Sequence, residues 1–481
     1  MPMGLSVKRS AAILLLLLAL LWPALAHQRP AYFFDSVAYL NVGNTGLAIL
    51  ERRIDALVGR DAAGPPGKAA AGQAAPPVEK AVVSIRSITY TLFVALLAAP
   101  DGRMFGVILV QAIIIAALIA MLFRDRAPAA RSVDTVAAVG LIAVATSAPW
   151  FASYAMPDVL AGALILVIAL LGVGGERLRT RERLFLTVVG AFAVTAHASH
   201  VLLGGALVVA GLIGLFFAVQ RWTGPAWRDA AWIAAPLALG VAATLLSSAV
   251  GVGEASVAPK RLPFALSRSI EDGPARWYLE RNCAKERYTI CRFFTRFPEK
   301  QAQILFGPGG INARASAAEM AAMRGEEALI LRRTFCAYPG AQLRAAAANF
   351  GRQLIVFGLQ DTSFGKVVEA QPDGKYVLVE IVERLDLRDP FTLLIYAGAA
   401  AALVYLASIR RSWSRSEVAL VGLLVTGLVA NAAIMGILSA VADRYQSRVI
   451  WVLPVMALAF WLARRTAADN STTAKVALAQ V

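Results

Sequence analysis

Long apolar runs, separated by short polar stretches, dominate the sequence. A run of about 17–25 apolar residues is long enough to cross a bilayer as a helix. The runs that reach or approach this length lie at residues 10–26, 104–123, 133–149, 158–174, 184–199, 201–219, 228–249, 391–409, 416–437 and 447–463. The pattern predicts an all-α polytopic membrane protein, a helical bundle with about ten transmembrane helices.

Two apolar runs need a separate interpretation. The run 88–100 is too short to span and is followed at once by Asp101-Gly102-Arg103, so we expect an interfacial or re-entrant helix there. The run 10–26 follows Lys8 and Arg9 and ends in small residues, which resembles a signal peptide. We favour a retained helix, because retention gives the even number of spans that the charge pattern requires.

Basic residues gather in alternate loops between the runs. With the N-terminus in the cytoplasm, the cytoplasmic loops contain Arg124, Arg126, Arg131, Arg177, Arg179, Arg181, Arg183, Arg221, Arg228, Arg410, Arg411, Arg415, Arg464 and Arg465. The outer loop near 440–448 contains only Arg444 and Arg448. Because cytoplasmic loops carry the excess of Lys and Arg, the pattern predicts both termini inside. We expect a multi-pass protein of a bacterial inner membrane.

The composition supports a membrane protein and excludes other classes. Of the 481 residues, 58% are hydrophobic and 16% are charged, whereas soluble domains average about 45–50% and about 25%. Soluble, disordered and disulfide-dense secreted chains are excluded on these values. The net charge of +16 would suggest a nucleic-acid partner in a soluble protein. Here the basic residues lie between apolar runs, so we expect no nucleic-acid partner.

The runs divide the chain into three regions. These are an N-terminal transmembrane bundle at 1–249, with a first outer loop at 27–87 and a short interfacial helix at 88–100, an extracytoplasmic domain at 250–390, and C-terminal transmembrane helices with a cytoplasmic tail at 391–481. The stretch 62–77 is rich in Pro, Gly and Ala, which is typical of a flexible linker.

The 250–390 segment has local signals of its own. Residues 316–337 and 340–358 are expected to be helical, with a turn at Tyr338-Pro339-Gly340 between them. Residues 376–383 are either a strand after the Pro372-Asp373-Gly374 turn or a short helix.

The three cysteines, Cys283, Cys291 and Cys336, all lie in this outer segment and lack metal-site spacing. Cys283 and Cys291 lie eight residues apart on the oxidising side of the membrane, so we predict that they form a disulfide. A bridge from either of them to Cys336 is the alternative.

Polar residues gather at the outer ends of the runs in three clusters. The first is Phe33 to Tyr39, in which Asp35 is a lone carboxylate flanked by aromatic residues. Such a carboxylate near low dielectric can act as a general base. The alternative is a helix cap, with Asp35 or Ser36 at the start of a helix that runs from Val37.

The second and third clusters lie near the start of later spans. Asp158 follows Pro157 and opens an apolar run, where it would also suit a helix cap. Arg444 and Arg448 flank Tyr445 and, at four residues apart, would share one face of a helix. Guanidinium groups match phosphate oxygens bidentately. The alternative is that both arginines extend to lipid headgroups.

His197 and His200 flank an outer turn between two runs. No third ligand lies near them in sequence, so we favour a hydrogen-bonded pair at a cavity over a metal site. With the aromatic neighbours Tyr39 and Tyr445, both histidines join the candidate substrate-binding residues.

Four segments together resemble the GT-C class of integral membrane glycosyltransferases, which includes protein mannosyltransferases and the aminoarabinose transferases that act on lipid A. They are FFDSVAYL at 33–40, RSITYTLFVALL at 86–97, SAPWFASYAMPD at 147–158 and DRYQSR at 443–448. The resemblance is best over residues 1–220 and the last span. The 250–390 segment takes no part in it.

The resemblance implies an enzyme that moves a hexose or pentose from a polyprenyl-phosphate donor to an acceptor on the outer face. By the resemblance, Asp35 is the base, Asp158 is a second acidic group, and Arg444 and Arg448 hold the phosphate. Ser36 stands where many relatives have a second acid, which leaves a divalent metal cofactor open. The partners implied are the lipid-linked donor, membrane lipid, and a glycan, lipid or protein acceptor.

Two other functions remain as alternatives. A polysaccharide polymerase or ligase would also use lipid-linked sugars and outer arginines, with 250–390 as its catalytic loop. A non-catalytic transporter or assembly protein is the other. Transporters often have ionisable residues at mid-membrane depth and repeated halves, and the sequence has neither pattern clearly.

Overall fold

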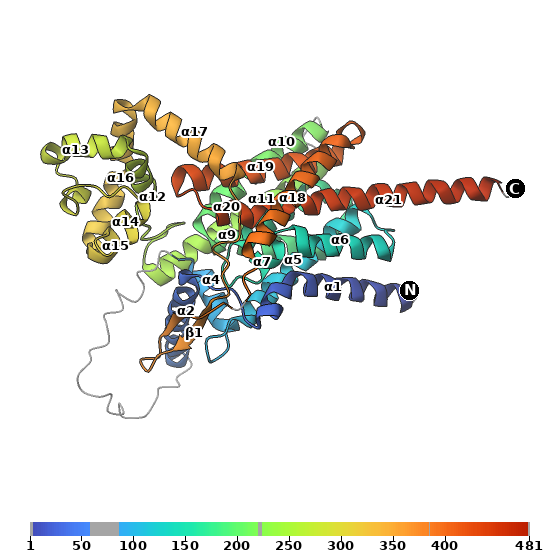
Figure 1. Ribbon diagram of the computed structural model, residues 1–481, viewed down its shortest axis with the longest axis horizontal. Helices are drawn as coiled ribbons and strands as arrows, with labels where there is room; N and C mark the ends of the chain where they lie inside the picture. Colours follow the sequence, from blue (N-terminus) through green and yellow to red (C-terminus); the bar gives the residue numbers. More distant parts are fainter. Residues whose placement is uncertain (1–2, 58–85, 220–223, 384, 480–481) are drawn as a thin grey trace.

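The computed structural model describes residues 3–57, 86–219, 224–383 and 385–479 and is almost entirely helical (Figure 1). The predicted linker at 62–77 lies outside the described residues. The first half of the chain contains α1 (Met3–His27), α2 (Phe34–Leu57), α4 (Ile88–Leu97), α5 (Phe105–Arg126), α6 (Ser132–Ala145), α7 (Ala148–Ala152), α8 (Val159–Gly174), η1 (Gly175–Arg177), α9 (Thr180–Ala196), α10 (Ala198–Val219) and α11 (Gly224–Val252).

The second half contains shorter outer elements and then the last long helices. They are α12 (Phe264–Asp272), α13 (Pro274–Glu286), η2 (Thr289–Arg292), α14 (Gln301–Phe306), α15 (Ile311–Arg314), α16 (Ala317–Ala337), α17 (Pro339–Ile355), β1 (Lys366–Ala370), β2 (Tyr376–Glu380), α18 (Arg388–Ser408), η3 (Arg410–Ser412), α19 (Arg415–Leu438), α20 (Asp443–Ile450) and α21 (Val452–Ala479).

Each predicted apolar run contains a helix, and the short run 88–100 contains α4. The predicted number of about ten spans stays a prediction. Among the described residues, six helices are long and apolar enough to cross a membrane by length and composition. The protein is therefore an all-α multi-pass membrane protein. The run 133–149 ends earlier than predicted, because α6 stops at Ala145. The predicted span 447–463 lies within one candidate span, Asp443–Asp469, in which α20 and α21 meet at Trp451.

Local sequence signals set several helix starts. Ser316 and Ser414 begin α16 and α19 with capping boxes that use Glu319 and Glu417. Ion pairs hold helix ends to one another, such as Arg464 Nη1 with Glu417 Oε1 at 2.8 Å. The basic clusters of the sequence thus also fix helix ends to one another.

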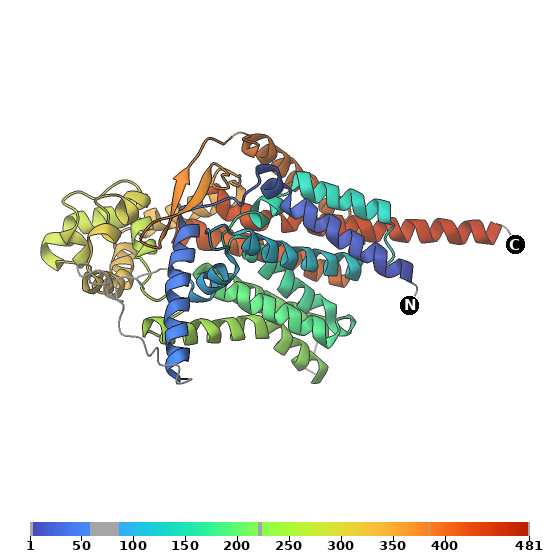
Figure 2. The same ribbon diagram turned by 90° about the horizontal axis from the view of Figure 1, so that it is seen from below.

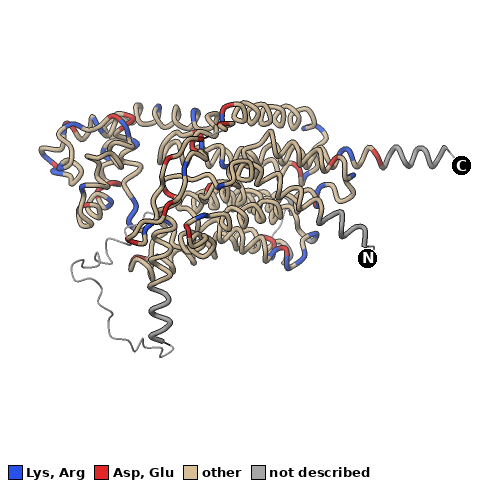
Figure 3. The backbone as a smooth tube through the Cα atoms, turned by 60° about the horizontal axis from the view of Figure 1, so that its bottom comes forward, with Lys and Arg blue, Asp and Glu red and all other residues tan. Residues whose placement is uncertain are grey.

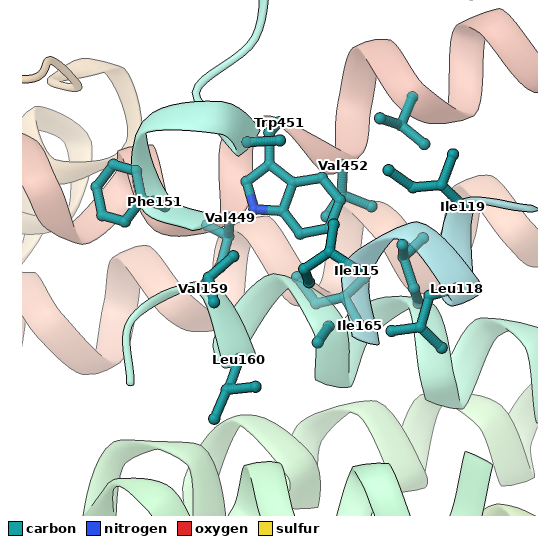
Figure 4. Close-up of a cluster of buried hydrophobic side chains, with 14 of the residues drawn as sticks. Ile115, Leu118, Ile119, Phe151, Val159, Leu160, Ile165, Val449, Trp451 and Val452 are labelled. Atoms are coloured by element: carbon teal, nitrogen blue, oxygen red, sulfur yellow. The ribbon is translucent and has the colours of Figure 1, made fainter. Parts of the chain in front are cut away.

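The core of the bundle lies where α5, α8 and α20–α21 meet. Figure 4 shows Trp451 surrounded by aliphatic side chains from these helices, and the Trp451 side chain is fully buried. Its indole packs on Gly162, where an added Cβ would lie 2.5 Å from Cζ2. Glycine at 162 therefore allows the close approach of α8 and Trp451.

The two chain ends lie at one end of the molecule, and the helical domain that contains α12 to α16 lies at the other (Figures 1 and 2). We call the end opposite the chain ends the outer end, in keeping with the predicted orientation. Charged residues gather toward the two ends of the bundle and in that domain, while most of the bundle length carries few (Figure 3). Helix α2 lies across the bundle axis at the outer end (Figure 2). This arrangement is the one expected of a bundle whose middle lies in lipid.

The outer segment 250–390 divides into two parts. Residues 262–338 have a hydrophobic core of their own, which includes Leu266, Leu279 and Ile330. The predicted helices of this segment are α16 and α17. Cys283 and Cys291 form the disulfide, as the sequence predicts, and Cys336 has an exposed free thiol.

The second part, residues 357–383, packs on the outer end of the bundle instead, because Phe357, Leu359 and Phe364 belong to the bundle core. The 376–383 segment resolves as a strand: β2 pairs antiparallel with β1. Asn41 of α2 holds this hairpin through two hydrogen bonds of 2.9 Å with the Tyr376 main chain. The hairpin therefore lies beside the segment that contains Asp35.

Candidate functional site

Asp35 lies in the first turn of α2, and its carboxylate bonds the guanidinium of Arg86. The cap-like bond at this helix start belongs to Ser36, whose Oγ accepts from the Phe33 main-chain N–H at 3.0 Å. Arg86 directly precedes Ser87, the N-cap of α4. An ion pair thus joins the starts of two helices and orients the Asp35 carboxylate.

The first two outer clusters are held side by side by main-chain bonds. Ala31 N–H donates to Ser153 O at 2.9 Å, and Ala155 N–H donates to Ala31 O at 3.0 Å. Since Ala31 lies just before Asp35, and Ser153 and Ala155 just before Asp158, this pairing brings both acidic residues to one region of the outer end.

Arg448 is the most deeply buried cation of the site, at 2% exposure. Its Nε and Nη2 donate to Asn431 Oδ1 at 3.1 and 2.8 Å, and Nη2 also donates to Ser199 Oγ at 3.1 Å. Its Nη1 lies 3.8 Å from Asp158 Oδ1. Such partners are what a buried charge requires, so Arg448 ties α20 to α19, α10 and the start of α8.

Asp158 is the N-cap residue of α8, but its side chain makes no cap hydrogen bond. The carboxylate is buried at 6% exposure and faces Arg448 instead. The cap alternative from the sequence is therefore not the role of the Asp158 side chain in this structure.

Arg444 lies at the mouth of the site among aromatic rings. Its guanidinium carbon is 4.2 Å from the centre of the Phe33 ring and 4.9 Å from that of Tyr445. Its Nε lies 3.5 Å from Asp361 Oδ2. Within the described part of the chain, Arg444 Nη1 and the Tyr154 hydroxyl are buried and make no well-formed hydrogen bond, although the two side chains lie close enough to interact with each other. An orphaned buried donor of this kind is rare in proteins and suits a ligand oxygen.

The charged groups converge on one place. Asp35, Arg86, Asp158 and Arg444 all act electrostatically on the buried hydroxyl of Tyr39. Arg448, Asp158, Arg444 and Asp35 act in the same way on the His197 ring. Charged residues from the first outer segment, the second outer loop and the last span thus lie within electrostatic range of both Tyr39 and His197.

His197 and His200 form hydrogen bonds with different partners. His197 Nδ1 bonds Ser199 Oγ at 2.8 Å, and Ser199 in turn accepts from Arg448. His200 is fully buried and bonds the Ala193 carbonyl oxygen at 2.7 Å through Nδ1. Among the described residues, no group of three or more His, Cys, Asp or Glu could hold a metal ion.

The candidate residues Tyr39 and Tyr445 contact the charged residues of the site through their rings. Tyr39 packs edge-on against Tyr90 at 4.9 Å, with Arg86 5.8 Å above its ring. The Tyr445 ring has Arg448 at 5.7 Å in addition to Arg444. The Cys283–Cys291 disulfide packs against the core of the 262–338 domain and takes no part in the site.

Sequence reasoning missed several residues of the site. Arg86 and Asn431 each bond a candidate residue directly. Asp361 and Lys366 come from the 357–366 segment, and Lys366 Nζ lies 4.2 Å above the Phe34 ring. None of the four has a local pattern that marks it. The nearest signal is the position of Arg86 inside the 86–97 motif.

The structure has a small cavity at the site and a larger apolar groove between other helices. A small cavity of about 30 Å³ is lined by Arg86, His197 and the hydroxyl residues Ser87, Thr195, Thr244, Ser247 and Ser248. It has room for about one water. A larger apolar groove of about 410 Å³ lies between α1, α6 and α18 and is lined by residues that include Trp22, Gly140 and Phe391.

Aromatic rings connect the groove with the outer segments. Trp22 lies 4.9 Å from Phe391 and 5.8 Å from Trp150, measured between ring centres. Trp150 lies 6.0 Å from Phe364, which is two residues before Lys366. The groove thus ends at the outer side of the bundle, next to the segment that carries Asp361 and Lys366.

Comparison of the chain with protein-family models, with curated proteins and with solved structures finds no match. The chemistry of the site is therefore argued from the residues themselves.

Proposed function

We propose that the protein is a glycosyltransferase of the outer membrane face, which moves a sugar from a polyprenyl-phosphate donor to an acceptor hydroxyl. The observation that carries the proposal is the Arg444 guanidinium, which lies 3.5 Å from the Asp361 carboxylate and has a buried Nη1 without a hydrogen bond among the described residues. A cation held in place beside a carboxylate is what phosphate departure and hydroxyl activation together require.

The proposed reaction exchanges one bond at the sugar for another. The Asp35 carboxylate takes the proton of the acceptor hydroxyl, and the acceptor oxygen bonds to the anomeric carbon. The bond from that carbon to the phosphate oxygen breaks, and its electrons leave with the polyprenyl phosphate. Arg444 holds the departing phosphate through its guanidinium donors.

The other residues support these two roles. Arg86 orients the Asp35 carboxylate through their ion pair. Arg448 and Asp158 fix α20 and α8, because their contact is buried together with Asn431. Rings at Phe33 and Tyr445 hold the Arg444 guanidinium by cation–π contact. These contacts hold the Asp35 carboxylate and the Arg444 guanidinium in place before a substrate binds, as electrostatic stabilisation of a transition state requires.

The apolar groove between α1, α6 and α18 is the proposed place for the prenyl chain. Its volume of about 410 Å³ is within the usual range of about 300–1,000 Å³ for small-molecule sites. It lies along helices that face lipid, and its aromatic end leads toward Phe364 and Lys366. A lipid-linked donor would then keep its chain in the groove and its phosphate at the mouth.

Turnover of the Asp35→Asn variant tests the proposal. Full-length protein in vesicles with a panel of polyprenyl-phosphate sugars should release polyprenyl phosphate in the presence of the acceptor. Because the amide cannot take a proton, turnover should fall by about 10²–10⁴-fold. Asp101→Asn is the matched control, since Asp101 is an outer aspartate that pairs with the exposed Arg103. Near-normal turnover in well-inserted Asp35→Asn protein would remove Asp35 from the chemistry.

A further inference from the structure

Asp361 is a carboxylate of the site that lies on the segment between α17 and β1. This segment is fixed to α20 by hydrogen bonds. Gly358 N–H donates to Ser447 Oγ at 2.7 Å, and Ser447 Oγ donates to Gly358 O at 2.7 Å. Gln360 N–H donates to Asp443 Oδ2 at 3.3 Å. The segment therefore presents Asp361 to α20 in a defined position.

The Asp361 carboxylate forms an ion pair with one side of the Arg444 guanidinium. Its Oδ2 lies 3.5 Å from Arg444 Nε, whereas Arg444 Nη1 makes no well-formed hydrogen bond among the described residues. A carboxylate and a phosphate both offer paired oxygens to a guanidinium fork. A ligand phosphate that takes this fork competes with the Asp361 carboxylate.

The surroundings of Asp361 make its charge costly. Burial raises the pKa of the Asp361 carboxyl above its ordinary value, while Arg444 on α20 acts in the opposite direction. Asp443 on α20 and Asp158 at the start of α8 raise it further, and Lys366 on β1 lowers it. If a ligand anion takes over Arg444, Asp361 loses its nearest cation and gains a negative neighbour. Both changes favour the protonated carboxyl.

We propose that the Asp361 carboxylate is an internal anion that holds Arg444 until an anionic phosphodiester ligand displaces it, and that Asp361 takes up one proton from solvent as the ligand binds. The proposal rests on the proposed function, because it assigns the ligand phosphate to Arg444. No covalent bond changes in this step. One carboxylate becomes one carboxylic acid, and the proton comes from water or buffer.

The coupling makes ligand affinity depend on pH. The bound protein contains one proton more than the free protein, so affinity falls as pH rises above the pKa of Asp361 in the free protein. The limiting slope for one proton is about tenfold in affinity for each pH unit. A phosphodiester probe with one permanent negative charge is needed, so that the ligand itself does not titrate.

Calorimetry with the full-length protein in nanodiscs and farnesyl methyl phosphate tests this coupling. Titrations between about pH 5 and pH 8, in two buffers with different heats of ionisation, give the protons taken up per ligand. We expect uptake that approaches one proton in the wild-type protein. Asp361→Asn should abolish the uptake, flatten the pH dependence and bind the probe more tightly at the upper end of the range. Asp373→Asn is the matched control, because Asp373 is an exposed aspartate that pairs with Lys375 in the hairpin turn.

Each other outcome counts against the proposal in a distinguishable way. Binding of the probe to the wild-type protein without proton uptake overturns the coupling and leaves the proposed function standing. An unchanged uptake in Asp361→Asn assigns the proton to another group and also overturns it. If the wild-type protein does not bind the probe at any pH in the range, both this inference and the donor site of the proposed function are wrong.

Discussion

The guanidinium of Arg448 lies 3.8 Å from the carboxylate of Asp158, Nη1 to Oδ1, with both side chains buried. Asp158 stands at the start of α8 and Arg448 lies in the last turn of α20, so the contact joins opposite halves of the chain. Because a buried charge is stable only with partners, this contact fixes the last span against α8. It thereby sets the position of Arg444, one helical turn before Arg448.

Removal of either partner should therefore destabilise the bundle to different extents. Arg448→Met leaves a buried carboxylate at Asp158 and should lower the free energy of unfolding by about 3–5 kcal/mol. Asp158→Asn should cost less, since Arg448 keeps its bonds to Asn431 and Ser199. Thermal unfolding of purified protein in detergent measures both. Equal losses in the two variants would contradict this ranking.

Arg444→Lys should weaken donor binding more than it weakens the fold. Lysine keeps the charge but loses the fork whose Nη1 is unpaired in the described structure. A lost hydrogen bond to a charged group is worth about 1.5–3 kcal/mol, or about 10–150-fold in the Kd for farnesyl phosphate. Arg103→Lys is the control, because Arg103 is an exposed outer arginine paired with Asp101. A similar loss of affinity in both variants would indicate general attraction to the surface instead of a site at Arg444.

Gly140→Leu should block the apolar groove without disturbing the fold. An added Cβ at Gly140 meets no atom within 4 Å, yet the residue lines the groove. We expect the variant to bind a polyprenyl-phosphate ligand more weakly but to bind inorganic phosphate as before. Gly214→Leu on α10 is the control, since its Cβ also meets no neighbouring atom and Gly214 does not line the groove. An unchanged affinity of Gly140→Leu for the prenyl ligand would remove the groove from the account.

Cys336 offers a direct test of orientation. Its thiol is free and exposed in the 262–338 domain, opposite the chain ends (Figure 1). With both termini in the cytoplasm, a membrane-impermeant maleimide should label Cys336 in intact cells. In a Cys336→Ser background, a cysteine placed at Arg179, which is exposed between α8 and α9, should react only after the cells are permeabilised. The reverse pattern would place the site on the cytoplasmic face.

The sequence predicts much of the fold because spans and caps are local features. Each apolar run became a helix, since length and apolar composition suffice for that. The end of α6 at Ala145 was not predicted, because the nearby Ser147 hydroxyl donates to the Ser447 carbonyl oxygen, a partner 300 residues away in sequence. The division of 250–390 was also missed. Phe357 and Phe364 look like core residues of any outer domain, and their bundle partners lie far away in sequence.

Local sequence features also identify only some of the residues of the candidate site. Asp35, Asp158 and Arg444 were found because each breaks an apolar pattern near a helix start. Arg86 and Asp361 were not assigned, because an arginine or aspartate in a polar loop has many ordinary explanations. Their roles depend on contacts with Asp35 and Arg444, which only the three-dimensional arrangement reveals.

The most direct test of the central claim is the position of a bound phosphate. We predict that an electron cryo-microscopy structure of the full-length protein in nanodiscs with a polyprenyl phosphate will show the phosphate on Arg444. An oxygen should lie about 2.7–2.9 Å from the Nη1 atom that is unpaired here, with Asp35 on the same side of the cavity. A phosphate bound elsewhere, for example at the arginines of the opposite membrane face, with Arg444 still paired with Asp361, would contradict the account.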